Sequence, residues 1–128
     1  MADTSYARKP RIEKLGVRPG TVVLLVSVTD AHFISELQAA GARITRTAAP
    51  DLIFCAVDTR ASLATLADLA KRMKPAGALW TIRPKGAALS EADVLTAGQA
   101  AGLVDVKVVR FSDTHTANKF VVRKTQRT

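Results

Sequence analysis

Polar and charged side chains follow directly after the most apolar segments of this 128-residue chain. They include carboxylates, hydroxyls, a histidine and several cations, the groups that move protons or hold a small anion. They become a site only if the fold brings the ends of these segments together. The candidates are Ser27, Thr29, Asp30, His32, Asp58, Arg60, Arg83, Lys85, Asp113, His115 and Asn118.

Asp113 and His115 are the candidates for acid/base catalysis. An imidazole titrates near neutral pH, and a neighbouring carboxylate can orient it. The alternative is a surface turn in which Asp113 bonds to the local backbone and His115 has no chemical role. We favour the turn, because no nucleophile or second motif supports catalysis.

Arg83 and Lys85 are the candidates for binding a phosphate or a carboxylate. The alternative is ion pairing with Asp58 or Asp113, and the sequence leaves both open. A metal site is not expected, because two histidines and one cysteine without paired spacing do not form a ligand set.

Apolar and β-branched runs predict the strands that position these groups. Asp30 and Ser90 precede helical patterns as N-caps, and Asp93 completes an acidic variant of the capping box. The polar link 112–118 is too short for a crossover helix, so the last two strands run antiparallel. The strands are expected at 21–29, 42–47, 51–57, 78–83, 103–111 and 119–123, and the helices at 31–40, 61–73 and 91–101.

Alternating strands and helices predict an α/β, three-layer, Rossmann-like fold, mostly parallel and closed by a C-terminal antiparallel pair. Parallel strands end at one edge, where ligands bind in such folds. The candidates after 27, 58 and 83 and in the link 112–118 are therefore expected in one cleft. We expect a basic flexible arm at 1–14 and one domain at 15–128.

Charge and composition limit the partners. The net charge of +8 lies mainly at the ends, with +3 in residues 1–20 and +3 in residues 123–128. Basic ends can bind nucleic acid, although a solvated terminus is the simpler interpretation. No apolar run spans a membrane. Cys55 is the only cysteine, which favours a cytoplasmic protein.

Several short motifs carry a family resemblance. Asp51-Leu52-Ile53 opens a middle strand, and Ala101-Gly102-Leu103-Val104-Asp105-Val106 enters the last pair. Lys74-Pro75-Ala76-Gly77-Ala78-Leu79-Trp80 leads into strand 78–83. Together these resemble the late motifs of class I S-adenosylmethionine-dependent methyltransferases. With segments 14–20, 80–86 and 118–123, the set is similar to a small bacterial family of unknown function, built like a trimmed methyltransferase.

That resemblance implies a glycine-rich turn after the first strand and an acidic residue ending the second. Here residues 27–32 contain no glycine, residues 43–47 contain no carboxylate, and the link 47–51 leaves no room for the usual helix and strand. We therefore expect no cofactor.

The departures favour a non-catalytic module that binds a small anionic ligand or a protein partner. A first alternative is an S-adenosylmethionine-dependent methyltransferase with a glycine-free turn. A second is a nucleic-acid-associated protein that uses its basic ends. An exposed strand could also mediate a homodimer.

Overall fold

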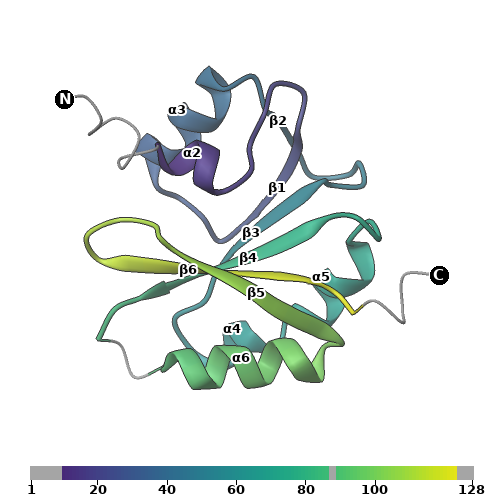
Figure 1. The fold of residues 1–128 in the computed structure, drawn as a ribbon, viewed down its shortest axis with the longest axis vertical. Coiled ribbons are helices and arrows are strands. Elements are labelled where there is room, and N and C mark those ends of the chain that lie inside the picture. Colours follow the sequence, from purple (N-terminus) through teal and green to yellow (C-terminus); the bar gives the residue numbers. More distant parts are fainter. Residues whose placement is uncertain (1–9, 87–88, 124–128) are drawn as a thin grey trace.

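Strands form one central sheet between two layers of helices in the computed structural model, which describes residues 10–86 and 89–123 (Figure 1). The strands are β1 (Val22–Val26), β2 (Arg43–Thr45), β3 (Leu52–Ala56), β4 (Ala78–Pro84), β5 (Leu103–Arg110) and β6 (His115–Val122). The helices are α2 (Arg11–Lys14), α3 (Ala31–Ala39), α4 (Arg60–Leu63), α5 (Leu66–Arg72) and α6 (Glu91–Ala100).

The sheet order is β2-β1-β3-β4-β6-β5. The pairs β1–β2, β1–β3 and β3–β4 are parallel, and β6 is antiparallel to both β4 and β5. This confirms the predicted Rossmann-like class with its C-terminal antiparallel pair. Between β2 and β3 the chain forms no further helix or strand, so the sheet is trimmed there as residues 47–51 predicted.

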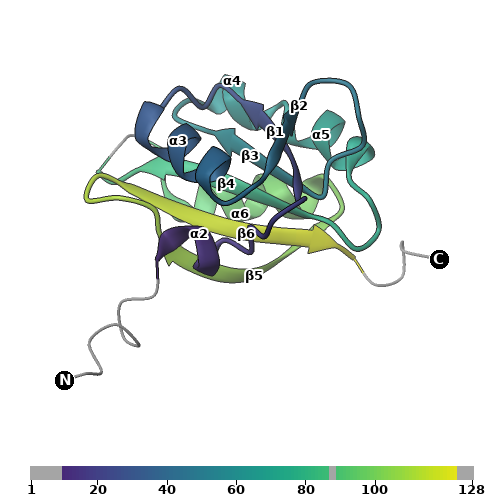
Figure 2. The same ribbon diagram turned by 90° about the horizontal axis from the view of Figure 1, so that it is seen from above.

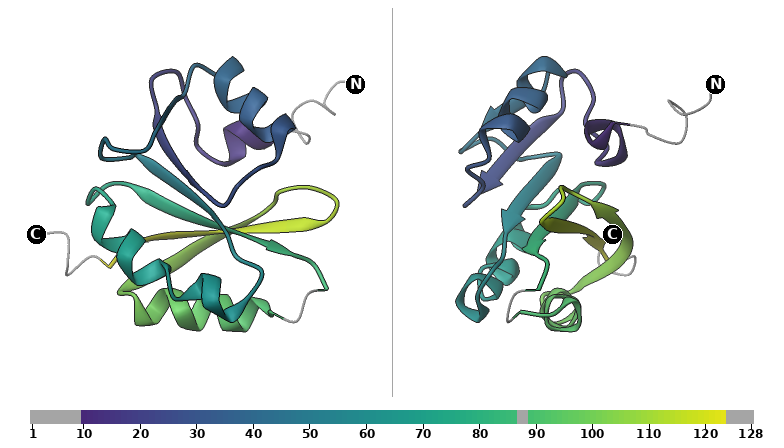
Figure 3. Two further views of the ribbon diagram at one scale, coloured as in Figure 1. Left: turned by 180° about the vertical axis from the view of Figure 1, so that it is seen from behind. Right: turned by 90° about the vertical axis from the view of Figure 1, so that its left-hand side faces the viewer.

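Two apolar cores lie on opposite faces of the sheet. One packs the α2–α3 side around Phe33, Phe54 and Trp80, and the other packs the α4–α6 side around Leu79 and Phe120. Figure 3 shows the two groups of helices apart from each other. Successive residues of a strand point to opposite faces, so Leu79 and Trp80 of β4 serve different cores.

The predicted caps are present at both helices. The Asp30 carboxylate accepts a hydrogen bond from the Phe33 N–H at 3.1 Å. At α6, Ser90 and Asp93 form a reciprocal capping box. The backbone N–H of Ser90 bonds to the Asp93 carboxylate and lowers its pKa. Within the described residues, no helix is both long and apolar enough to cross a membrane.

Several predicted segments differ from the structure, among them β6, which begins at His115 and not at residue 119. The helix expected over 61–73 is interrupted after Leu63, where the Thr65 hydroxyl bonds to the Ser62 carbonyl at 2.7 Å. The arm expected over 1–14 is not loose at 11–14, because these residues form α2 against the β5–β6 hairpin (Figure 2). Residues 1–9 and 124–128, and with them half of the lysines and arginines of the predicted basic ends, lie outside the described residues.

Asp51 joins the starts of neighbouring strands and predicts an acid-sensitive contribution to stability. Its carboxylate accepts from Lys74 Nζ and from the Val22 N–H, each at 2.8 Å. The Lys74 hydrogen bond, followed by that from Val22, lowers the Asp51 pKa. A lowered folded-state pKa means that this stabilisation is present above the unfolded value of about 3.9 and is lost as pH falls through the folded value.

We therefore expect Asp51→Asn to lower the urea midpoint at pH 6, and the difference from wild type to shrink below about pH 4. Urea titrations at several pH values measure this difference. Asp58→Asn, which changes an exposed carboxylate, is the control. A difference independent of pH would show that the charge of Asp51 is not what stabilises the strands.

Candidate functional site

A hollow of about 220 Å³ opens at the carboxyl ends of β1, β3 and β4. From β1 the chain crosses to β2 on one side and returns to β3 on the other, so the strand order reverses here. Open α/β sheets bind ligands at such a switch point. We call this the switch-point hollow; its walls are Ser27, Val28, Thr29, Asp30, Ala56, Ile82, Phe111 and His115.

The β1–α3 loop forms one wall with an unusual backbone. Ser27 has φ +60°, the only positive φ of a non-glycine residue in the described ranges. Such a conformation is costly for a side chain with a Cβ and concentrates at functional sites. The turn that lacks glycine in the sequence therefore adopts, at Ser27, a backbone shape that glycine usually supplies.

The charge of the hollow is acidic. Asp30 is exposed at its rim, and its carboxylate also caps α3. Neither lysine nor arginine is among the residues that line the hollow in the described chain. Its remaining polar walls come from hydroxyl groups and His115. This lining suits a neutral or cationic ligand rather than the small anion that the sequence suggested.

Arg83 and Asn118 do not reach this hollow. The Arg83 guanidinium points toward the backbone oxygens of Pro84 and Leu89, both at 3.4 Å. Asn118 is fully buried within β6 and donates to Glu91 Oε2 at 3.1 Å. The sequence placed Asn118 in a loop ending at 118, but β6 already begins at His115, because its polar residues pair with β4 along the sheet.

The other predicted residues lie apart from one another. Asp58 and Arg60 line a separate hollow of about 60 Å³, where Arg60 pairs with Asp93 at 3.5 Å. Lys85 and His32 are exposed, and neither lines the switch-point hollow. The single cleft expected from the sequence is thus divided, and only Ser27, Thr29, Asp30 and His115 meet.

Asp113 and His115 do not form a dyad. Asp113 forms an ion pair with Arg110, and His115 Nδ1 lies 2.7 Å from the Thr114 hydroxyl. The Phe111 and Ser112 amides both donate to the His115 carbonyl at 3.1 Å, so the segment is a hydrogen-bonded turn. The segment is thus a turn, as we favoured from the sequence, but the side chain that accepts from its backbone amides is Ser112 and not Asp113.

Phe111, Ala56 and Ile82 line the hollow but were not singled out from the sequence. Phe111 could have been found, because it ends a predicted strand at the same edge as the other candidates. A larger hollow, of about 450 Å³, lies at the opposite edge between α5 and α6. Four of its ten lining residues are alanines and Lys71 is the one charged residue among the ten, so it offers fewer polar groups than the switch-point hollow.

Comparison with known proteins identifies the fold. No family model matches the sequence, and no curated protein matches it. A S-adenosylmethionine-dependent methyltransferase from Aquifex aeolicus is similar in structure, with a TM-score of 0.69 at 17% identity, covering 94% of each chain. The fold is therefore that of class I methyltransferases, in trimmed form.

Two other neighbours carry ligands. The 1,6-didemethyltoxoflavin-N1-methyltransferase from Burkholderia thailandensis contains S-adenosylhomocysteine (TM-score 0.62, 13% identity, 91% of this chain and 78% of that chain). The magnesium protoporphyrin IX methyltransferase from Synechocystis PCC 6803 contains S-adenosylmethionine (TM-score 0.55, 13% identity, 88% and 74%). Our expectation of no cofactor is therefore wrong: these two neighbours of the same fold bind S-adenosyl ligands, so the missing glycines alone did not justify excluding such a ligand.

The residues around the switch-point hollow fit the methionine half of an S-adenosyl ligand better than the ribose half. Ser27 supplies the bent backbone after β1, and Asp30 supplies a negative charge beside it. At the end of β2, in contrast, the Thr45 hydroxyl is bonded to the amides of Thr47 and Ala48 and no carboxylate follows. The hollow is also smaller than the 300 Å³ or more, roughly, that drug-sized ligands occupy. The charged methionine half fits this site better than the ribose half.

Proposed function

We propose that this chain is a methyltransferase-fold binding module that takes S-adenosylmethionine at the switch-point hollow. The observation that carries the proposal is the hollow itself, which lies where the strand order reverses and has an acidic rim without cations. S-adenosylmethionine carries a sulfonium and an ammonium against one carboxylate, so its net charge is positive. Asp30 attracts that charge, whereas an anionic ligand would be repelled.

Within this site each residue has a definite part. Ser27 and Thr29 offer hydroxyls at the loop, Asp30 holds the positive charge, and Phe111 and Ile82 form the apolar wall. Bound S-adenosylmethionine would supply an electrophilic methyl group. Transfer of that group to a weakly acidic acceptor needs a base, and the group that meets the His115 Nδ1 is the Thr114 hydroxyl, with no carboxylate from the described residues to orient the ring. This supports a binding role rather than catalysis.

Titration calorimetry with S-adenosylmethionine and S-adenosylhomocysteine tests the proposal. We expect Asp30→Asn to weaken S-adenosylmethionine binding about tenfold, roughly 1.4 kcal/mol. Binding of the homocysteine form, which has no sulfonium, should change much less. Asparagine caps a helix as well as aspartate does, so α3 is retained and only the charge is lost.

Asp58→Asn is the matched control, because it removes one carboxylate at the same edge but outside the hollow. It should leave both affinities unchanged. Wild-type protein that binds neither ligand at millimolar concentration would refute the proposed function. Equal weakening by both variants would show that only the overall charge matters.

A further inference from the structure

We propose that Arg11 is a positioning residue for the switch-point hollow: it fixes the turn 111–115, which carries two of the hollow's wall residues. Arg11 itself does not line the hollow. Its effect on ligand affinity rests on the proposed function, whereas its effect on the turn does not.

Arg11 makes three directed hydrogen bonds. Its Nη1 donates to the Phe111 carbonyl at 2.7 Å, across 100 residues of sequence. Its Nε and Nη2 donate to the two carboxylate oxygens of Glu36 in α3 at 2.8 and 3.0 Å. Paired bonds of this kind fix both distance and orientation. The guanidinium therefore ties α2 and α3 to the end of β5.

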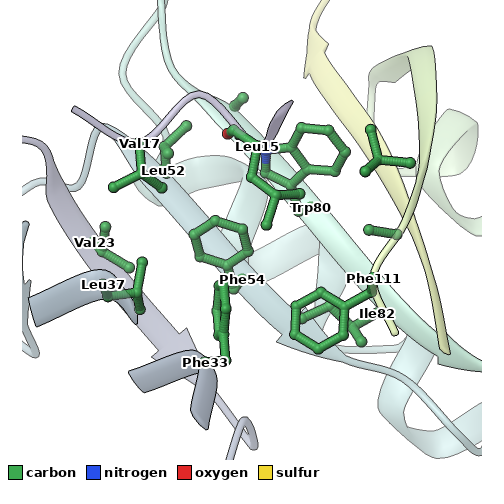
Figure 4. Packing of buried hydrophobic residues seen from close by; sticks show 13 residues of the cluster. Leu15, Val17, Val23, Phe33, Leu37, Leu52, Phe54, Trp80, Ile82 and Phe111 are labelled. Carbon is green, nitrogen blue, oxygen red and sulfur yellow. Dashed lines mark hydrogen bonds between the residues drawn. The ribbon is translucent and has the colours of Figure 1, made fainter. Parts of the chain in front are cut away.

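The same guanidinium stacks on two aromatic rings. It lies 4.5 Å from the centre of the Phe111 ring and 5.1 Å from that of Phe33. The two rings contact each other edge to face at 4.8 Å (Figure 4 shows both rings). Only 17% of the Arg11 side chain is exposed, so these contacts are largely shielded from water. A flat, delocalised cation suits this position, and a lysine ammonium does not.

The turn held by Arg11 is short and hydrogen-bonded. The Phe111 and Ser112 amides both meet the His115 carbonyl, so movement of Phe111 moves His115 with it. Phe111 and His115 line the hollow opposite the β1–α3 loop. Without Arg11, the Phe111 carbonyl loses a hydrogen bond and the Phe111 ring loses a cation contact. The positions of Phe111 and His115 in the wall of the hollow are then less fixed.

Helix α2 has a second anchor, so the contribution of Arg11 can be isolated. The Trp80 indole N–H donates to the Leu15 carbonyl at 3.1 Å, and Leu15 is fully buried. Figure 4 shows the indole nitrogen turned toward Leu15. Trp80 is the only tryptophan, so its fluorescence reports whether the segment after α2 stays docked in a variant.

The experiment compares wild type with Arg11→Gln, Arg11→Lys and the control Arg18→Gln. Arg18 is exposed on the same segment, so the control removes the same charge without those contacts. Amide hydrogen exchange at Phe111 and Ser112 is the first readout. We expect exchange at these amides to be at least tenfold faster in both Arg11 variants than in wild type, and unchanged in the control. Trp80 emission should be unchanged in all three variants. Because lysine keeps the charge but lacks the planar fork, Arg11→Lys should resemble Arg11→Gln.

The second readout is S-adenosylmethionine affinity by calorimetry, which we expect to fall at least threefold in the Arg11 variants only. Unchanged exchange at Phe111 and Ser112 would overturn the inference, whether or not the ligand binds. Faster exchange with unchanged affinity would also overturn it, because the turn would then not shape the site. If wild type binds no S-adenosyl ligand, the proposed function fails, and hydrogen exchange alone decides whether Arg11 fixes the turn.

Discussion

We expect Gly98→Ala to destabilise the protein, although alanine is the better helix former. A Cβ at residue 98 would lie 2.3 Å from Cε1 and 2.7 Å from Cδ1 of Phe120. Phe120 is fully buried in β6, so its ring has little freedom to move away. Overpacking of this kind costs about 1–3 kcal/mol, which over most of this range exceeds the gain of about 1 kcal/mol in helix propensity.

Urea denaturation measures this change, and the predicted net loss of unfolding free energy is up to about 2 kcal/mol. Gln99→Ala in the same helix is the control, because Gln99 is exposed and gains propensity without a clash. If Gly98→Ala were as stable as wild type, α6 could shift on the sheet at little cost. The close approach of α6 to β6 would then not be what requires glycine.

Phe33→Ala is expected to have the largest effect of any single change considered. Phe33 is fully buried and lies between Phe54, at 5.0 Å between ring centres, and Phe111, at 4.8 Å. It is also the residue whose N–H is capped by Asp30. Removing a buried phenylalanine side chain costs about 3–5 kcal/mol, a large part of the stability of a domain of this size.

The measurement is a thermal melt, in which we expect the midpoint to fall by roughly 10–20 °C. Ile34→Ala, at the next position of α3, is the control, because Ile34 is only half-buried and should cost much less. Equal losses in the two variants would mean that α3 is stabilised by general apolar burial rather than by the aromatic cluster. A folded Phe33→Ala variant should also bind ligand less well, since Phe111 loses one neighbour.

The local elements could be predicted because each has a local cause. The Asp30 cap precedes a helix pattern, and the runs that form β1, β3 and β4 are largely apolar and strand-sized. The parallel order followed from the alternation of strands and helices. The short link 47–51 also predicted the trimmed edge, because five residues cannot hold another helix and strand.

The site was predicted only in part, because a strand pattern does not say which face each residue serves. Arg83 and Ile82 are neighbours in β4, yet Ile82 lines the hollow and Arg83 points to the opposite layer. Asn118 is a second example. Because β6 begins at His115 and its side chains alternate between the two faces of the sheet, Asn118 points to the face covered by α6, where it contacts Glu91. A strand that starts earlier than expected changes a loop residue into a core residue.

The class of fold, the helix caps, the glycine-free turn and the lack of a carboxylate in residues 43–47 all follow from the sequence. Packing sets the rest: the positive φ of Ser27, the position of the predicted cations outside the switch-point hollow, and the contact of Arg11 with Phe111 across 100 residues. The two groups differ in the sequence separation of the residues that interact. Caps, turns and apolar periodicity act between residues a few positions apart, whereas the walls of the hollow come from four separate segments that only packing brings together.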